Sequence, residues 1–148
     1  MTEEHDTRAE LQDLAARYAA GADRRDGLLF VSAFLPEGRL RRFEPADASE
    51  PMTDRQGSGA LAAVPQLLAR YARTFHHLGQ ARYEIDGDVA AGEVYCTASH
   101  LTADEAPVVQ VMHIRYHDVY RRVDGRWGIE DRRVLVDWTE QHPLGHRR

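Results

Sequence analysis

The chain has 148 residues, of which 43% are hydrophobic and 29% charged, a composition typical of one globular domain. Its net charge of −5 argues against nucleic acid as a partner, because phosphate binding needs a basic surface. All 19 basic residues are arginine, so no lysine is present to form a Schiff base. The chain contains no run of about 20 apolar residues that could span a bilayer, so we expect no membrane partner.

The N-terminus is acidic and polar, which does not fit a secretory signal. The chain has a single cysteine, Cys96, so no internal disulfide can form within it. Both features lead us to expect a cytoplasmic protein.

The first half of the chain predicts helices. Thr7 and Glu10 have the spacing of a capping box, and Leu11, Leu14 and Tyr18 then recur at helical spacing. In chain order we expect a helix from residue 7 to about 21, a helix over 28–34 capped by Asp26, a strand over 37–44, a mobile loop over 46–59 and a helix over 58–73.

After residue 73 the hydrophobic pattern changes from helical to alternating. Four strands are expected, over 74–86, 89–101, 108–123 and 126–139. Asp86-Gly87 and Asp124-Gly125 are strong signals for tight hairpin turns. Helices followed by an antiparallel meander predict a single α+β domain over 1–148, with its core at about 7–140 and a polar C-terminal tail.

Polar residues interrupt several apolar faces of these elements. His100 shares a strand face with Cys96, and Arg132 shares one with Val134. Each such residue also has a structural interpretation: a tyrosine on a buried stripe belongs to the core, and Arg132 could pair with Asp118 across the sheet. The residues by themselves leave the structural and the catalytic interpretation open.

Spacings typical of a metal or nucleotide site are missing from the sequence. Cys96 has no cysteine partner, and His113 and His117 are four apart on a predicted strand, too far for a ready chelate. The run 57–59 (Gly-Ser-Gly) lacks the further glycine or lysine of a phosphate-binding loop. We therefore expect no metal and no cofactor.

Three runs of sequence resemble the SnoaL-like family of the nuclear-transport-factor-like superfamily. They are Tyr18-x4-Asp23-Arg-Arg-Asp26, then Thr74-Phe-His76-His-Leu-Gly-Gln80, and Tyr120 to Arg132 closed by Asp137-Trp138. The resemblance covers about residues 7–140 and is closest to the branch with scytalone dehydratase, bile-acid dehydratase and dehydrochlorinase. It implies a cone-shaped α+β barrel, with three N-terminal helices packed in the concave face of a strongly curved, mainly antiparallel sheet.

The same resemblance implies five catalytic residues. His76 is the base, Asp23 orients it, Tyr18 polarises a substrate carbonyl, His100 is the acid for a leaving group, and Arg132 lies at the pocket floor. The residues expected to bind substrate are Phe30, Phe34, Met112, Tyr116, Asp118, Val134 and Trp138.

Two points of this comparison stay open. The spacing to residues 82–84 favours His76 over His77 as the histidine that faces the pocket, but does not decide between them. Gln80 stands where many relatives have asparagine, and the serine and asparagine that complete the scytalone dehydratase pocket are absent.

The implied function is a cofactor-independent acid–base enzyme acting on a hydrophobic cyclic molecule, polyketide- or steroid-like, with dehydration as the leading reaction. An isomerase or aldol cyclase of a natural-product pathway is the alternative, and a non-catalytic ligand-binding or assembly domain is the alternative from another class. An enzyme predicts Asp23 and His76 about 2.6–3.2 Å apart in an apolar cavity. A binding domain predicts Arg132 paired with Asp118, and His76 either exposed or packed in the core. We also expect a homodimer or homotrimer, formed through the outer face of the sheet.

Overall fold

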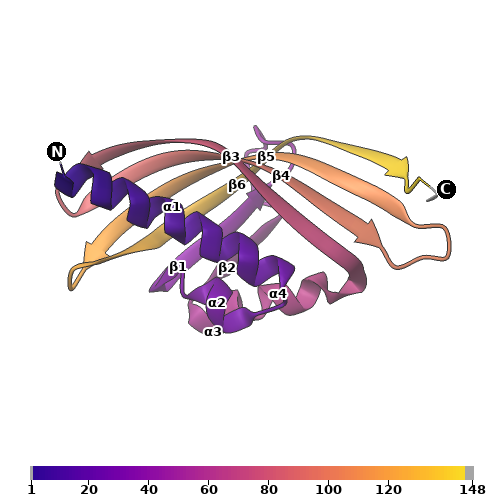
Figure 1. Cartoon of the computed structure of the whole chain (residues 1–148), viewed down its shortest axis with the longest axis horizontal. Coiled ribbons are helices and arrows are strands. Elements are labelled where there is room, and N and C mark those ends of the chain that lie inside the picture. Colours follow the sequence, from indigo (N-terminus) through magenta and orange to yellow (C-terminus); the bar gives the residue numbers. More distant parts are fainter. Residues whose placement is uncertain (1, 146–148) are drawn as a thin grey trace.

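The computed structural model describes residues 2–145, which form helices lying against one curled sheet (Figure 1). The helices are α1 (Thr2–Asp23), α2 (Gly27–Val31), α3 (Ser58–Ala62) and α4 (Val64–Leu67), followed by a 3-10 turn (Leu68–Arg70). The strands are β1 (Phe34–Phe43), β2 (Thr53–Gln56), β3 (Tyr71–Asp86), β4 (Val89–Thr102), β5 (Val108–Val123) and β6 (Arg126–Pro143).

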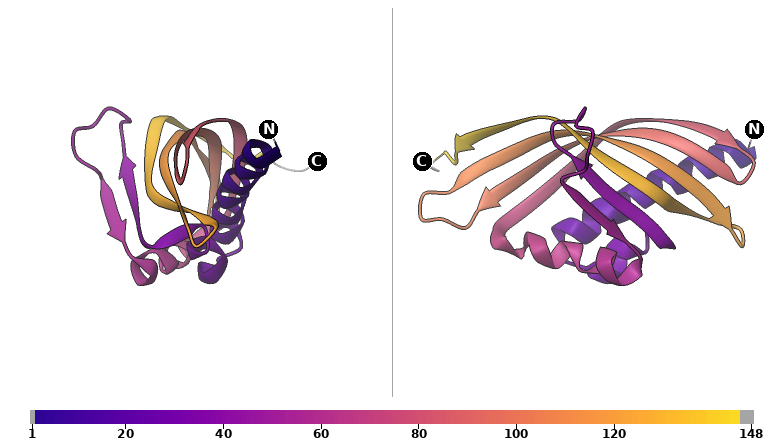
Figure 2. Two further views of the ribbon diagram at one scale, coloured as in Figure 1. Left: turned by 90° about the vertical axis from the view of Figure 1, so that its left-hand side faces the viewer. Right: turned by 180° about the vertical axis from the view of Figure 1, so that it is seen from behind.

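The sheet has the order β2-β1-β6-β5-β4-β3, and its strands pair antiparallel except for the parallel pair β1 and β6. It is strongly curled, with α1 running across its concave side and the short helices at one end (Figure 2). The expected α+β fold is thus confirmed. The sheet curls without closing, because β2 and β3 remain as its two edges.

The two predicted hairpin turns join β3 to β4 and β5 to β6. Gly87 has φ 60°, and Asp124 and Gly125 have φ 51° and 77°. These left-handed conformations are the ones that tight hairpin turns need, and glycine adopts them without steric cost.

Helix α1 begins at Thr2, five residues before the expected start. Thr7 lies inside this helix and is 5% exposed, so the capping box at Thr7 is wrong. The threonine packs on the buried face of α1 together with Leu11 and Leu14. The second predicted cap is confirmed, since the Asp26 carboxylate accepts a hydrogen bond from the Leu29 amide at 3.0 Å.

The segment between β1 and β3 differs most from expectation. The single helix expected over 58–73 is broken into α3, α4 and a 3-10 turn, because Pro65 has no N–H with which to continue a helix. The loop expected over 46–59 contains β2, whose residues Thr-Asp-Arg-Gln lack the apolar alternation of a strand signal. β6 also continues to Pro143, beyond the expected end at residue 139.

The core lies between α1, α2 and the concave face of the sheet, where Leu11, Phe30, Ile114 and Val136 are buried together. Among the described residues, no helix is long and apolar enough to cross a membrane.

Gly21 lets α1 and α2 approach each other closely. A Cβ at this position would lie 2.5 Å from the backbone nitrogen and 2.6 Å from the Cα of Phe30. We expect Gly21→Ala to lower the free energy of unfolding by about 1–3 kcal/mol, measured by urea denaturation, because overpacking displaces rigid backbone. Gly59→Ala is the matched control, since its Cβ would meet open space. An unchanged stability of Gly21→Ala would show that α2 shifts freely.

Candidate acid–base site

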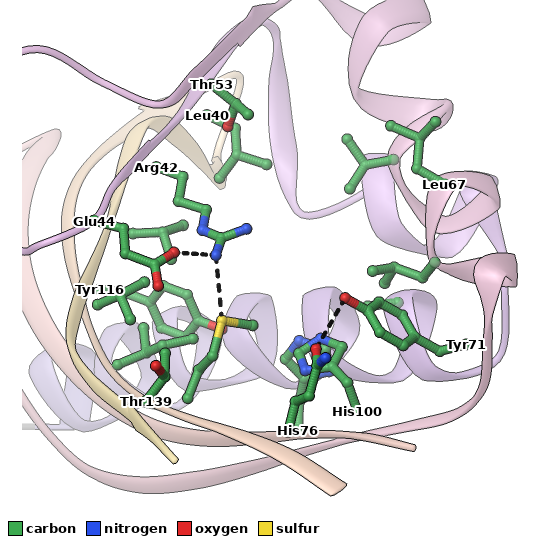
Figure 3. A pocket seen from close by; sticks show the side chains of 18 of the residues that line it. Leu40, Arg42, Glu44, Thr53, Leu67, Tyr71, His76, His100, Tyr116 and Thr139 are labelled. Atoms are coloured by element: carbon green, nitrogen blue, oxygen red, sulfur yellow. Dashed lines mark hydrogen bonds and ion pairs between the residues drawn. The ribbon is translucent and has the colours of Figure 1, made fainter. Parts of the chain in front are cut away.

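A cavity of about 590 Å³ lies between the helices and the concave face of the sheet. Its walls are mostly apolar, with Ala22, Phe30, Leu40, Val64, Leu68, Met112, Ile114, Val134 and Val136 among the lining residues. Polar side chains form its floor: Tyr18, His100 and Tyr116 are buried, and His76 is half-buried. Figure 3 shows His76, His100 and Tyr116 at the cavity. An apolar cavity with a few convergent polar groups is the usual form of a small-molecule site.

Asp23 and His76 form a hydrogen-bonded pair at the edge of this floor. The distance from His76 Nδ1 to Asp23 Oδ1 is 2.7 Å, and the His76 backbone N–H donates to Asp23 Oδ2 at 2.9 Å. The His76 side chain is 9% exposed and lines the cavity. The histidine is therefore held at two points, with its other ring nitrogen left for a ligand.

Three segments hold Asp23 in place. Asp23 is the last residue of α1, and the Thr74 hydroxyl on β3 donates to its Oδ1 at 3.0 Å. Arg25 in turn donates to the Thr74 hydroxyl at 3.0 Å and to the backbone oxygen of Tyr71. The turn after α1 is thus tied to the start of β3, which brings the carboxylate to His76.

These contacts determine the charge of Asp23 and the tautomer of His76. Burial raises the pKa of Asp23, but the hydrogen bonds from the His76 ring and backbone, the charge of His76 and the Thr74 hydroxyl outweigh it, so the pKa lies below its ordinary value. An ionised carboxylate only accepts hydrogen bonds, so Nδ1 of His76 carries the proton. Its Nε2 then has a free lone pair and can act as a base.

His100 is the diagonal neighbour of His76 across the β3–β4 pair, since Thr74 pairs with His100 and His76 pairs with Ala98. The two imidazole centroids are 6.0 Å apart. Burial lowers the pKa of His100 to about 4, with the charges of His76, Arg42 and Arg70 adding to the effect. His100 is therefore neutral near pH 7, and its Nδ1 is buried without a partner among the described residues.

Tyr18 and Tyr116 present protonated hydroxyls. Burial raises the pKa of Tyr18 to about 12 although the charge of Arg132 opposes it, and burial raises the pKa of Tyr116 well above its ordinary value. Such groups donate hydrogen bonds at all physiological pH values.

Arg132 lies behind these two rings and does not line the cavity. Its guanidinium carbon is 4.4 Å from the ring centroid of Tyr18 and 4.0 Å from that of Tyr116. Its side chain is fully buried and donates two hydrogen bonds, at 2.9 and 2.7 Å, to the equally buried carboxylate of Asp118. Tyr120 donates to the same carboxylate at 2.6 Å. Arg132 therefore reaches a ligand only through the tyrosines.

The cavity brings together seven of the residues singled out in the sequence, with Asp23 beside it: Tyr18, Phe30, His76, His100, Met112, Tyr116 and Val134. Phe34, Asp118 and Arg132 are buried around this group but do not line the cavity. The structure thus has the Arg132–Asp118 pair expected of a binding domain and the Asp23–His76 distance expected of an enzyme.

The expected placement of Trp138 in the pocket is wrong. A bulge in β6 lets Ile114 pair with Val136 and His113 pair with Trp138, so that Asp137 is an extra residue. This insertion reverses the alternation of side chains. Trp138 is 57% exposed and stacks on His113 at 4.1 Å, outside the cavity, and Thr139 lines the cavity instead.

The open choice between the adjacent histidines is decided by the alternation of β3. His76 lines the cavity, whereas His77 lies with Trp138 and His113 around a separate hollow. Alternation also identifies Thr74, which lies two residues before His76 on the same face and was not among the expected site residues. Arg25 carried no such signal, because its contacts with β3 are made across 46 to 49 residues of chain.

A curled sheet over a cavity with this floor defines the cone-shaped α+β class of small-molecule-binding folds. The SnoaL-like domain pattern matches residues 3–133, and the chain belongs to this family. No curated protein sequence is significantly similar to it.

Solved structures share the fold. A Mycobacterium tuberculosis protein of unknown function is 27% identical, with 92% of this chain and 75% of that chain covered and a TM-score of 0.77. A hexachlorocyclohexane dehydrochlorinase (LinA type 2) is 18% identical, with 97% and 93% covered and a TM-score of 0.82. A protein of Novosphingobium aromaticivorans, provisionally assigned as a scytalone dehydratase, is 17% identical, with 99% and 94% covered and a TM-score of 0.77. At these two lower identities the likeness shows the fold alone.

Removing the buried guanidinium should destabilise the protein strongly. Arg132→Met leaves the Asp118 carboxylate buried without its partner, so we expect a loss of about 3–5 kcal/mol in the free energy of unfolding. Arg115→Met is the matched control: its bidentate pair with Asp137 is partly exposed, and we expect a loss under about 1 kcal/mol. Urea denaturation measures both. Equal losses would contradict a special role for the buried pair.

His100 should make the fold sensitive to acid. Its pKa is lowered from 6.5 to about 4 in the folded protein, so the unfolded chain binds more protons between these values. Stability should therefore fall as the pH falls from about 6.5 to 4, and His100→Gln should reduce that slope. Unfolding free energies measured across this range test it, with His77→Gln as the control. The same slope in His100→Gln and the wild type would contradict the expectation.

Proposed function

We propose that this protein is an acid–base enzyme that removes a proton next to a carbonyl group of a hydrophobic cyclic substrate, with dehydration as the overall reaction. The observation that supports this proposal most directly is the 2.7 Å contact between Asp23 Oδ1 and His76 Nδ1 at the floor of an apolar cavity. This contact places a proton on His76 Nδ1 and orients the ring, so that Nε2 is the nitrogen available to a ligand.

The first step is proton abstraction. His76 Nε2 takes a proton from the carbon next to the carbonyl, and the ionised Asp23 stabilises the imidazolium that forms. The Tyr18 hydroxyl, with that of Tyr116 beside it, donates a hydrogen bond to the developing enolate oxygen. One such donor contributes roughly 3–4 kcal/mol in the transition state.

The second step is loss of water. The enolate electrons form a carbon–carbon double bond as the bond to the β-hydroxyl breaks, and the hydroxyl leaves with the proton held by the His76 imidazolium. The family resemblance implies His100 as the donor of this proton. The lowered pKa of His100 favours a different role, because a neutral imidazole donates a hydrogen bond to the departing oxygen but is a weak acid.

Two other functions stay open to the same test. An isomerase or aldol cyclase would use the same proton abstraction without a leaving group. A binding or assembly domain is favoured by the pairing of Arg132 with Asp118. An arginine held by a buried carboxylate is not available to act on a ligand.

The first experiment follows proton abstraction directly. The protein is incubated in D2O with cyclic β-hydroxy ketones, 3-hydroxy-1-tetralone first, while NMR records deuterium at the carbon next to the carbonyl and fluorescence records the 1-naphthol formed by dehydration. We expect both signals in the wild type and neither in His76→Gln. Asp23→Asn should reduce the rate by about 10³–10⁴-fold, because the histidine is then held in the wrong tautomer.

His77→Gln is the matched control, since this neighbour lies outside the cavity, and it should keep the wild-type rate. Deuterium exchange without naphthol would support the isomerase or cyclase. If no ketone exchanges, or if His76→Gln exchanges as fast as the wild type, the enzyme proposal fails and a binding domain becomes the better account.

The expected homodimer or homotrimer and the expected cytoplasmic location stay predictions. An oligomer would be consistent with the exposed rings of Phe75, Tyr95 and Trp138 on the sheet.

A further inference from the structure

Three arginines, Arg42, Arg55 and Arg70, line the same cavity as the Asp23–His76 pair but lie toward solvent. The floor residues Tyr18 and Tyr116 are 6% and 1% exposed, whereas the Arg42 side chain is 31% exposed. In Figure 3 the Arg42 guanidinium is directed into the cavity from the side opposite Tyr71, above His76 and His100. The cavity therefore has an acid–base floor and a cationic mouth.

The register of the β1–β2 pair places two of these arginines side by side. Arg42 pairs with Thr53, and Leu40 pairs with Arg55. All four residues line the cavity, so they share one face of the ribbon, and Arg42 and Arg55 are diagonal neighbours on it. Like charges on diagonal neighbours of a β-ribbon repel each other unless an anion lies between them.

Acidic side chains neutralise this group only in part. Arg42 donates to Glu44 and to the Met112 sulfur through Nη2 alone, which leaves its Nε and Nη1 without an acceptor among the described residues. Arg55 makes no hydrogen bond or ion pair within residues 2–145, and Arg70 donates to the Tyr71 hydroxyl at 3.2 Å. The second glutamate at the mouth, Glu140, lies 3.7 Å from His113.

The positive mouth stands out against a chain of net charge −5. A cleft lined by one sign of charge attracts ligands of the other sign, and arginine binds carboxylates and phosphates in a fork geometry. Across the mouth Tyr71 and Gln110 are joined at 3.4 Å and add further polar groups. A neutral apolar substrate would have no use for these groups.

We infer that the substrate of this cavity carries an anionic group, a carboxylate or a phosphate, which binds between Arg42 and Arg55 at the mouth while its ring system fills the apolar walls. This inference names the substrate class of the acid–base site and so rests on the proposed function. It also gives the ligand an orientation, because the anion and the reacting carbon occupy opposite ends of the cavity.

Binding of simple probes tests the charge preference without any turnover. Isothermal titration calorimetry compares 2-naphthoate with 2-naphthamide, which has nearly the same shape and no charge, and with 2-naphthyl phosphate. We expect the naphthoate to bind about tenfold more tightly than the amide, as charge-assisted hydrogen bonds allow. Arg55→Gln should remove most of this preference, Arg55→Lys should keep part of it, and added salt should weaken only the anions.

Arg126→Gln is the matched control, because it makes the same charge change at an exposed residue outside the cavity and should keep the wild-type preference. Tighter binding of the phosphate than of the naphthoate would identify a phosphoryl group as the anion. Equal affinity for naphthoate and naphthamide, no binding of the naphthoate at millimolar concentration, or an unchanged preference in Arg55→Gln would overturn the inference. Since no turnover is measured, such a result leaves the Asp23–His76 dyad standing, and loss of exchange in His76→Gln leaves the charge preference standing.

Discussion

The ion pair between the fully buried guanidinium of Arg132 and the carboxylate of Asp118 is the interaction around which this fold is arranged. Transferring such a charge from water costs several kcal/mol, which only close partners offset. Arg132 has those partners in Asp118, with two hydrogen bonds, and in the rings of Tyr18 and Tyr116, which lie over it. The tyrosines come from α1 and β5 and the arginine from β6, so one charge joins the helix to the centre of the sheet. The position of the cavity floor follows from that junction.

The acid–base pair depends on a different junction, between the end of α1 and the start of β3. Asp23 accepts three hydrogen bonds there, two from His76 and one from Thr74. A carboxylate with three donors stays ionised although it is partly buried, which in turn holds the proton on His76 Nδ1. The two groups thus occupy different places: the buried charge of Arg132 lies behind the floor, and His76, held by Asp23, lines the cavity.

The two ends of the cavity differ in electrostatic character. The floor holds neutral donors and one ionised carboxylate, and the pKa of His100 is lowered chiefly by burial. The charges of His76, Arg42 and Arg70 lower it further. Burial, with these charges adding to it, keeps the His100 imidazole unprotonated near pH 7.

Local patterns were enough for the elements that local chemistry controls. The alternating strands, the glycine turns at 87 and 125 and the Asp26 cap depend on neighbouring residues, and the quoted motifs indicated Tyr18, Asp23 and His76. The helix expected over 58–73 is broken by Pro65 within the segment itself. The missed β2 and the misplaced Trp138 have another cause, since each depends on pairing with another strand. The bulge at Asp137 has no local signal, yet it turns every following side chain to the other face of the sheet.

The sequence by itself determined the order of elements and the chemistry available. Only the tertiary structure decided which of those groups meet in one cavity, because contacts over 46 to 53 residues of chain are set by sheet register and helix packing.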